Sequence, residues 1–346
     1  MLSYRKKLGY AVGDLGISVS YFAVGFFYMF YLTDIVGLSA YWAGLAVFIG
    51  KLWDGVNDPL VGIFNDRFTT KQGRKRAFVL WGALPFALSF MFLWFIPTEA
   101  SQLVKFTLAT LSLLLYATTY SIVVVPYMSL VPVLSEEYDE RTQITGLRAI
   151  LATVGTIIGG GLALWISSFE NELLGLHSMA LGFGLFTAAS LLIAAQSVKG
   201  LESGQFEQIV PVKLSSYLSL IKDQNVLLLM GLKFLGAIGT GTLSASIPYY
   251  AEHVMGDRGL SSKDLAAYVI ASALFVPVWS KATRHFDKRR LLLISNMGSA
   301  VVLYYLGFYI VAGNLMGFYL TCFALGIVMS AYLLIPYSLL PDLVDF

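Results

Sequence analysis

Long apolar stretches separated by short polar segments run through the whole sequence. Most reach the length of about 20 residues that a helix needs to cross a membrane. Their hydrophobicity is continuous rather than alternating, which is typical of helices and not of barrel strands. The expected spans are 8–33, 40–63, 77–97, 103–131, 145–168, 177–197, 224–250, 265–282, 290–312 and 314–340. The pattern therefore predicts an all-α membrane protein with ten transmembrane helices.

The composition agrees with this pattern and excludes several classes of protein. Of the 346 residues, 57% are hydrophobic and 13% are charged, whereas soluble domains carry about 25% charged residues. The net charge of +2 gives no basic surface for a nucleic acid. The single cysteine, Cys322, cannot form an internal disulfide. The sequence has no nucleotide-binding loop, no Ser-His-Asp arrangement and no metal-spaced His or Cys, so we expect neither an enzyme nor a bound cofactor.

Lysine and arginine residues gather on one side of the predicted spans. With the N-terminus in the cytoplasm, 18 of the 23 Lys and Arg residues lie in cytoplasmic segments and three lie outside. Such a bias predicts a cytoplasmic N-terminus. The first apolar stretch follows Arg5, Lys6 and Lys7 but is too long for a signal peptide, so we expect a retained helix. We expect the protein to be integral to the cell (inner) membrane.

A polar segment and a weak internal repeat divide the chain into two parts. The segment 198–222 is rich in Ser, Gln, Glu and Lys and separates six spans from four. We therefore expect an N-terminal six-helix bundle at 1–197, a cytoplasmic linker at 198–222 and a C-terminal bundle at 223–346. A Pro-Tyr pair closes both the fourth span, at Pro126, and the tenth, at Pro336. Repeated halves are typical of transporters.

The repeat also predicts that parts of the chain are missing. Spans seven to ten correspond to spans one to four, so two further spans are expected and the C-terminal bundle is expected to be truncated. The eighth span is also short, because 265–280 makes about 24 Å of helix against a hydrocarbon core of about 30 Å. The short eighth span leaves open an internal deletion in addition to the C-terminal truncation.

Ionisable residues in the second span form the strongest candidate site. Asp54, Asn57 and Asp58 lie on one helical face because they are three and four residues apart, and Lys51 lies one turn earlier. Charged groups inside a span are costly and commonly functional. Two close carboxylates in a low dielectric repel each other, so one holds a proton or both share a cation. The alternative is that Lys51 and Asp54 form a pair that only holds helices together.

Further polar residues follow one face of the first and fourth spans. In the first span, Ser18, Tyr21 and Tyr28 continue a stripe that begins at Asp14, which favours a cavity over lipid. The fourth span carries a stripe with Tyr120, Val124 and Met128, and the seventh span carries Lys233. The alternatives are packing or interfacial anchoring for the tyrosines and reaching to the headgroups for Lys233.

Several motifs resemble those of one transporter family. They lie at 7–14, 31–38, 51–59, 140–142 and 340–345. The Trp-Asp-x-x-Asn-Asp-Pro element at 53–59 is the most specific. These segments resemble the glycoside–pentoside–hexuronide:cation symporters of the major facilitator superfamily. Members have twelve spans, so the resemblance implies a major facilitator fold that lacks its last two helices here.

The resemblance implies roles for individual residues. By position, the family's cation site becomes Asp54, Asn57, Asp58 and Ser121, with Asp54 and Asp58 as ligands of Na⁺ if the protein is sodium-coupled. The superfamily's cytoplasmic gating loop implies gating roles for the residues that match it: Gly62, Asp66, Arg67 and Arg74.

The sugar site of the family is only partly matched. Tyr120 and the cytoplasmic-side Arg148 persist, whereas Ser18, Val124 and Met128 stand where the pattern has two aspartates and a tryptophan. The expected substrate pocket is therefore less acidic and more apolar. An acidic sugar such as a hexuronide would suit three basic residues: Lys51, Arg148 and Lys233. The candidate substrate-binding residues are Ser18, Tyr21, Tyr28, Lys51, Tyr120, Val124, Met128, Arg148 and Lys233.

Together these observations predict a monomeric secondary transporter in a lipid bilayer. It would carry a sugar, glycoside or uronide together with Na⁺ or H⁺ by alternating access. Two alternatives remain open. One is a lysolipid, amphiphile or drug carrier on the same fold, and the other is a membrane sensor that binds a ligand without transporting it.

Overall fold

The computed structural model divides into two compact units, Met1–Val212 and Lys213–Phe346. The structure describes residues 2–67, 73, 75–135, 137–161, 165, 169–202, 227, 231, 234–236, 238–239, 241–242, 246–247, 249–256, 258–283, 285–310 and 314–344.

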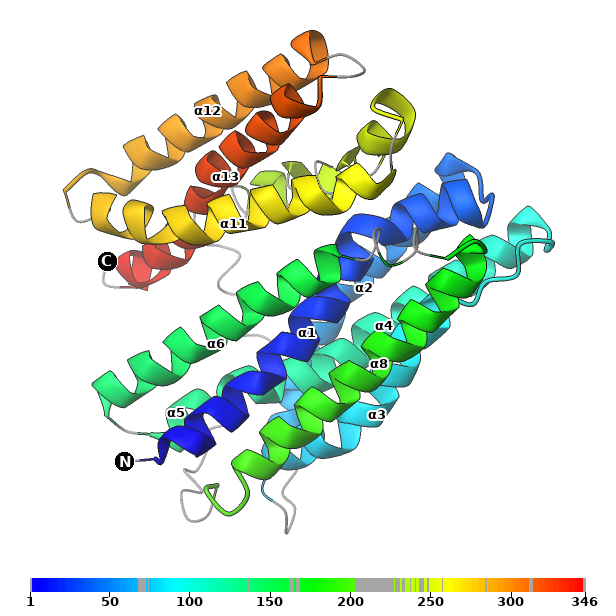
Figure 1. The fold of residues 1–346 in the computed structure, drawn as a ribbon. Helices are drawn as coiled ribbons and strands as arrows, with labels where there is room; N and C mark the ends of the chain where they lie inside the picture. Colours follow the sequence, from blue (N-terminus) through cyan, green and yellow to red (C-terminus); the bar gives the residue numbers. More distant parts are fainter. Residues whose placement is uncertain are drawn as a thin grey trace. The chain divides into compact units, whose positions relative to one another are not determined.

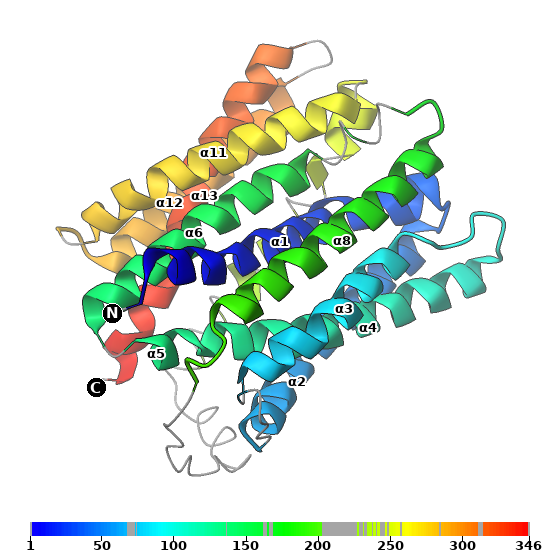
Figure 2. The same cartoon turned by 60° about the horizontal axis from the view of Figure 1, so that its bottom comes forward.

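The first unit consists of long helices that pack side by side (Figure 1). Its elements are α1 (Tyr4–Phe30), which continues as a π-helical turn, η1 (Tyr31–Ile35), then α2 (Ala40–Arg67), α3 (Lys75–Leu93), α4 (Gln102–Ser129), the short α5 (Val131–Leu134), α6 (Tyr138–Gly160) and α8 (Glu172–Ser197). Helix α1 lies between α6 and α8, and Figure 2 shows the same order from another side. Helix α4 packs against both α2 and α3, and α3 against α8.

Polar side chains and one glycine define where these helices begin. The Ser101 hydroxyl accepts a hydrogen bond from the Val104 amide at the start of α4, and Asn171 accepts from the first amides of α8. Gly37 has φ +71, a conformation that favours glycine, in the turn between η1 and α2. The side chain of Gln102 donates to the Gly37 carbonyl at 2.7 Å and accepts from the Ser39 amide at 2.9 Å. These contacts fix the start of α2 to the start of α4.

Small residues let α1 approach α6 closely. A Cβ atom on Gly155 would lie 2.3 Å from the backbone carbonyl oxygen of Leu15, and one on Gly159 would lie 2.8 Å from that of Val19. Backbone contact of this kind is typical of membrane helices that meet at glycines. The register of α1 on α6 is therefore set by these two positions.

The second unit contains η2 (Tyr250–Val254), α11 (Arg258–Ala282), α12 (Lys288–Tyr309) and α13 (Leu315–Val344). Helix α13 packs against α11 and α12. Hydroxyl groups join these helices at the backbone, since Ser272 donates to the Gly326 carbonyl at 3.1 Å and Ser295 to the Val328 carbonyl at 2.7 Å. In the seventh expected span, the described residues between 227 and 249 are helical.

The helices confirm most of the expected spans. Among the described residues, six helices are long and apolar enough to cross a membrane, and they correspond to the first, third, fourth, fifth, sixth and ninth expected spans. The other four spans stay predictions. The eighth expected span lies in α11, which begins at Arg258 and has 25 residues, about 37 Å of helix. Its apolar part is short, as expected, because within this helix the apolar segment is Ala267–Val276. The internal deletion stays a prediction.

Candidate cation and solute site

The candidate cation residues lie where α2 packs against α4. The two helices run in the same direction, because Ser39 meets Gln102 at their starts and Asp58 meets Ser121 further along both. The Trp53 indole donates to the Thr118 hydroxyl at 2.8 Å, and one turn further Asn57 donates its amide hydrogen to the Ala117 carbonyl at 3.3 Å. Asn57 is buried in this contact. The interface therefore holds the polar face of α2 against α4.

Asp58 and Ser121 meet across this interface. The Ser121 hydroxyl lies 2.5 Å from Oδ1 of Asp58 and donates to it, and the serine is fully buried. Each helix also contains a proline, Pro59 directly after Asp58 in α2 and Pro126 five residues after Ser121 in α4. Because proline has no amide hydrogen, Pro59 leaves the Gly55 carbonyl without its helical donor. Asp58 and Ser121 thus bring a carboxylate and a hydroxyl into direct contact at the α2–α4 interface.

Asp54 has a charged partner on its own helix. The ammonium of Lys51 lies 3.7 Å from Oδ2 of Asp54, and the two side chains are 64% and 31% exposed. The ammonium also lies 5.6 Å from the centre of the Tyr21 ring, within the range of cation–π contacts. The expected Lys51–Asp54 pair is therefore present, and it leaves Asp58 with a neutral partner.

The cluster of Lys51, Asp54, Asn57, Asp58 and Ser121 has charges and oxygen ligands that suit a small monovalent cation. Two carboxylates and one ammonium sum to a charge of −1, which one Na⁺ or one proton would neutralise. Oxygen atoms of the kind that Asp54, Asn57, Asp58 and Ser121 carry suit hard cations. The described part of the chain holds no group of three or more His, Cys, Asp or Glu residues that could bind a metal ion. The donor set therefore fits a coupling ion better than a tightly held divalent metal.

Some candidate solute residues lie near this cluster. The rings of Tyr21 and Tyr120 have centres 5.7 Å apart, and Tyr21 is half exposed. Tyr28 lies elsewhere: it is 1% exposed, its hydroxyl is 3.3 Å from that of Ser112, and its ring packs against Trp94. The structure therefore places Tyr28 in a packed aromatic cluster and Tyr21 at the surface of the first unit.

The remaining candidates are spread over α1, α2, α4 and α6. Ser18 faces α6, where its Cβ lies 3.0 Å from the position that a Cβ on Gly155 would take. Val124 is buried, whereas Met128 is exposed. Gly62, Asp66 and Arg67 belong to the last two turns of α2. Arg74 and Lys233 lie outside the described residues.

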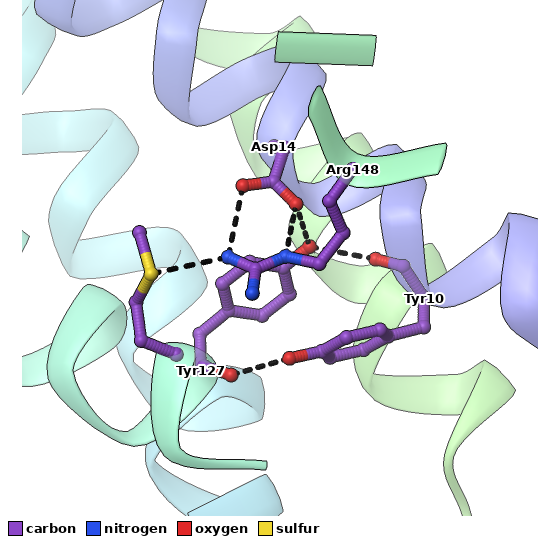
Figure 3. Close-up of polar contacts among 5 residues, drawn as sticks. Tyr10, Asp14, Tyr127 and Arg148 are labelled. Atoms are coloured by element: carbon purple, nitrogen blue, oxygen red, sulfur yellow. Dashed lines mark hydrogen bonds and ion pairs between the residues drawn. The ribbon is translucent and has the colours of Figure 1, made fainter. Parts of the chain in front are cut away.

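Arg148 lies in a network with Asp14, which the sequence placed in the polar stripe of the first span, and with Tyr10 and Tyr127, to which it gave no role. It forms an ion pair with Asp14 of α1, with 2.7 Å between Nε and Oδ2, and the two tyrosines Tyr10 and Tyr127 surround the pair (Figure 3). Asp14 stands at the head of the polar stripe of α1, and a buried carboxylate needs a counter-charge. That need is the signal in the sequence that points to a partner for Arg148.

Comparisons with known proteins agree with the resemblance found in the sequence. The family described as "MFS/sugar transport protein" matches residues 9–346. Sodium-dependent lysophosphatidylcholine symporter 1 of Gallus gallus is 25% identical over 99% of this chain and 71% of its own length. The isoprimeverose transporter of Lactiplantibacillus pentosus is 25% identical over 85% of this chain and 62% of its own length.

The fold is also similar to that of a solved transporter. The crystal structure of a D-xylose-proton symporter matches with a TM-score of 0.70 over 98% of this chain and 82% of that protein, at 11% sequence identity. The all-α membrane fold expected from the sequence is therefore confirmed as the major facilitator fold. The chain belongs to the MFS/sugar transport protein family, and it is a transporter rather than an enzyme.

Proposed function

We propose that this protein moves a sugar or glycoside across the membrane together with Na⁺ or H⁺. The contact between Asp58 and Ser121 at the α2–α4 interface carries this proposal. Asp54 has Lys51 as a counter-charge, whereas the partner of Asp58 among the described residues is the Ser121 hydroxyl. A cation that binds beside Asp58 would neutralise the cluster, and a neutral cluster is cheaper to enclose in a low dielectric.

The exposed aromatic surface of the first unit supports a sugar as the solute. Tyr21 presents a half-exposed ring beside Tyr120, and aromatic faces stack on the apolar faces of sugar rings. The relative from Lactiplantibacillus pentosus is named as a transporter of isoprimeverose. These observations support a carbohydrate solute at this surface.

A lysophospholipid is the second candidate solute. Met128 presents an exposed apolar side chain on α4, whereas Val124 is buried in the same helix. The relative from Gallus gallus, which is named as a sodium-dependent lysophosphatidylcholine symporter, aligns with 99% of this chain. An apolar surface beside a cation site would suit an amphiphile carried with Na⁺.

The proposed mechanism is alternating access of the two units in the cell membrane, with the N-terminus in the cytoplasm. In this proposal the cation and the solute bind together before the protein changes the side of the membrane to which the site opens. The end of α2, with Gly62, Asp66 and Arg67, would gate the cytoplasmic side together with Arg74. We propose that the monomer is the transporting unit.

Uptake by reconstituted vesicles tests the function. Wild-type protein is expected to accumulate an uncharged glycoside, or lysophosphatidylcholine in the second case, when a Na⁺ or H⁺ gradient is imposed. Asp58→Asn is expected to abolish this accumulation while solute binding persists. Accumulation by Asp58→Asn at the wild-type level would reject the cation site. Solute binding without ion-dependent exchange by the wild-type protein would instead indicate a sensor.

A further inference from the structure

Arg148 is the centre of a buried network that joins three helices of the first unit. Its Nε lies 2.7 Å from Oδ2 of Asp14 and its Nη2 lies 3.1 Å from Oδ1, so two parallel hydrogen bonds connect α6 to α1 (Figure 3). Both side chains are about nine-tenths buried. Paired bonds of this kind between guanidinium and carboxylate are strong and fix the geometry of both groups.

Two tyrosines and a methionine complete the surroundings of this pair. The Tyr127 hydroxyl donates to Oδ2 of Asp14 at 2.6 Å, and the Tyr10 hydroxyl donates to the Tyr127 carbonyl at 2.5 Å. The guanidinium carbon lies 4.8 Å from the centre of the Tyr127 ring and 5.7 Å from that of Tyr10. The sulfur of Met128 lies 3.1 Å from Nη2 of Arg148.

The position of Met128 places this network directly beneath the surface of the first unit. Met128 is 51% exposed, whereas Arg148 below it is 9% exposed. A solute that lies on the α4 surface would therefore meet the methionine and, beneath it, a guanidinium whose charge is already balanced by Asp14. The other basic candidate in the described residues, Lys51, also has a carboxylate partner in Asp54.

We propose that Asp14 determines the charge of the transported solute by holding Arg148 in a neutral pair. The solute would then carry no net charge, as a neutral glycoside or a zwitterionic lysophospholipid does, and would not be a uronate. This inference rests on the proposed function. An anionic solute that took the paired bonds of Nε and Nη2 would have to displace Asp14, and a buried carboxylate that has lost its partner is strongly destabilising. The acidic sugar considered from the sequence is therefore disfavoured.

Binding to the purified full chain in detergent tests this proposal. Two matched pairs of probes separate charge from solute class: methyl glucoside against glucuronate, and lysophosphatidylcholine against lysophosphatidic acid. The pair that contains a bound member identifies the class. In either pair, the wild-type protein is expected to prefer the member without net charge. Asp14→Asn, which leaves Arg148 uncompensated, is expected to shift this preference toward the anionic member by about tenfold or more, because hydrogen bonds to charged groups contribute that much.

A second variant separates charge selection from damage to the fold. Asp14→Asn combined with Arg148→Gln contains no unpaired charge and is expected to lose the shift toward the anion. Retention of the anionic preference by this double variant would overturn the proposal, because the preference would then not come from Arg148. Tighter binding of the anionic member by wild-type protein would overturn it as well, whether or not Asp14→Asn folds. Binding that is indifferent to Na⁺ and pH would reject cation coupling alone and leave the charge preference standing.

Discussion

Removing the Ser121 hydroxyl tests the cation site with the smallest change in the structure. Ser121→Ala deletes one buried oxygen that donates to Oδ1 of Asp58 over 2.5 Å. A hydrogen bond to a charged group contributes about 1.5–3 kcal/mol, and each 1.4 kcal/mol corresponds to about tenfold in an equilibrium constant. If the hydroxyl also faces the ion, the affinity for the coupling cation is expected to fall about ten- to hundredfold.

The assay is thermal unfolding of the purified protein over a range of NaCl concentrations at constant ionic strength, and over a range of pH. A ligand that binds the folded state raises the unfolding temperature according to its concentration relative to its dissociation constant. The concentration of Na⁺ or H⁺ at half-maximal stabilisation is expected to rise in Ser121→Ala.

The matched control for this experiment is Ser89→Ala. It also deletes a buried hydroxyl that bonds to α4, here to Thr119 at 2.6 Å, but on the α3 side. The control is expected to leave the half-maximal ion concentration unchanged even if it lowers the unfolding temperature. Equal ion dependence of Ser121→Ala and wild-type protein would refute the placement of the cation between α2 and α4.

Three further changes give distinct outcomes. Asp58→Asn is expected to retain solute binding but lose ion-driven uptake in vesicles; a normal response to the gradient would contradict the assignment. Gly155→Val would place a Cβ 2.3 Å from the Leu15 carbonyl oxygen and is expected to lower the free energy of unfolding by about 1–3 kcal/mol. The control is Gly146→Val, because Gly146 has open space around it. Similar losses of stability in both variants would contradict the close α1–α6 contact. Arg67→Ala is expected to slow uptake while solute affinity stays the same, and a parallel loss of both would argue against gating.

The sequence predicted the helices well because a membrane demands long apolar segments whatever the tertiary structure is. It also predicted that Asp54, Asn57 and Asp58 share one face, since this depends only on helical spacing. Ser121 came from the family resemblance, and the structure places it against Asp58 through the pairing of α2 with α4. Local spacing and one homologous position were therefore enough to assemble the candidate cation site.

Features that depend on contacts between distant helices escaped the sequence. Asp14 and Arg148 are 134 residues apart, and the spacing within either span gives no indication that the two meet. Tyr28 follows the same polar stripe as Tyr21, yet the end of α3 brings Trp94 against it and buries it. A stripe shows which residues share a face, but the neighbouring helix decides whether that face is open or packed.

Charged residues of the first unit lie in two places, the Asp14–Arg148 pair and the α2 face that carries Lys51, Asp54 and Asp58. Asp14 is balanced by Arg148 and Asp54 by Lys51, whereas Asp58 has the neutral Ser121 as its partner. In our proposal, a cation that binds beside Asp58 supplies the positive charge that Ser121 lacks. A charged solute would add a second charge beside the bound cation, whereas a solute without net charge would leave the cation as the only added charge. Coupling to a cation and preference for a solute without net charge are thus, in our proposal, two consequences of one arrangement of charges.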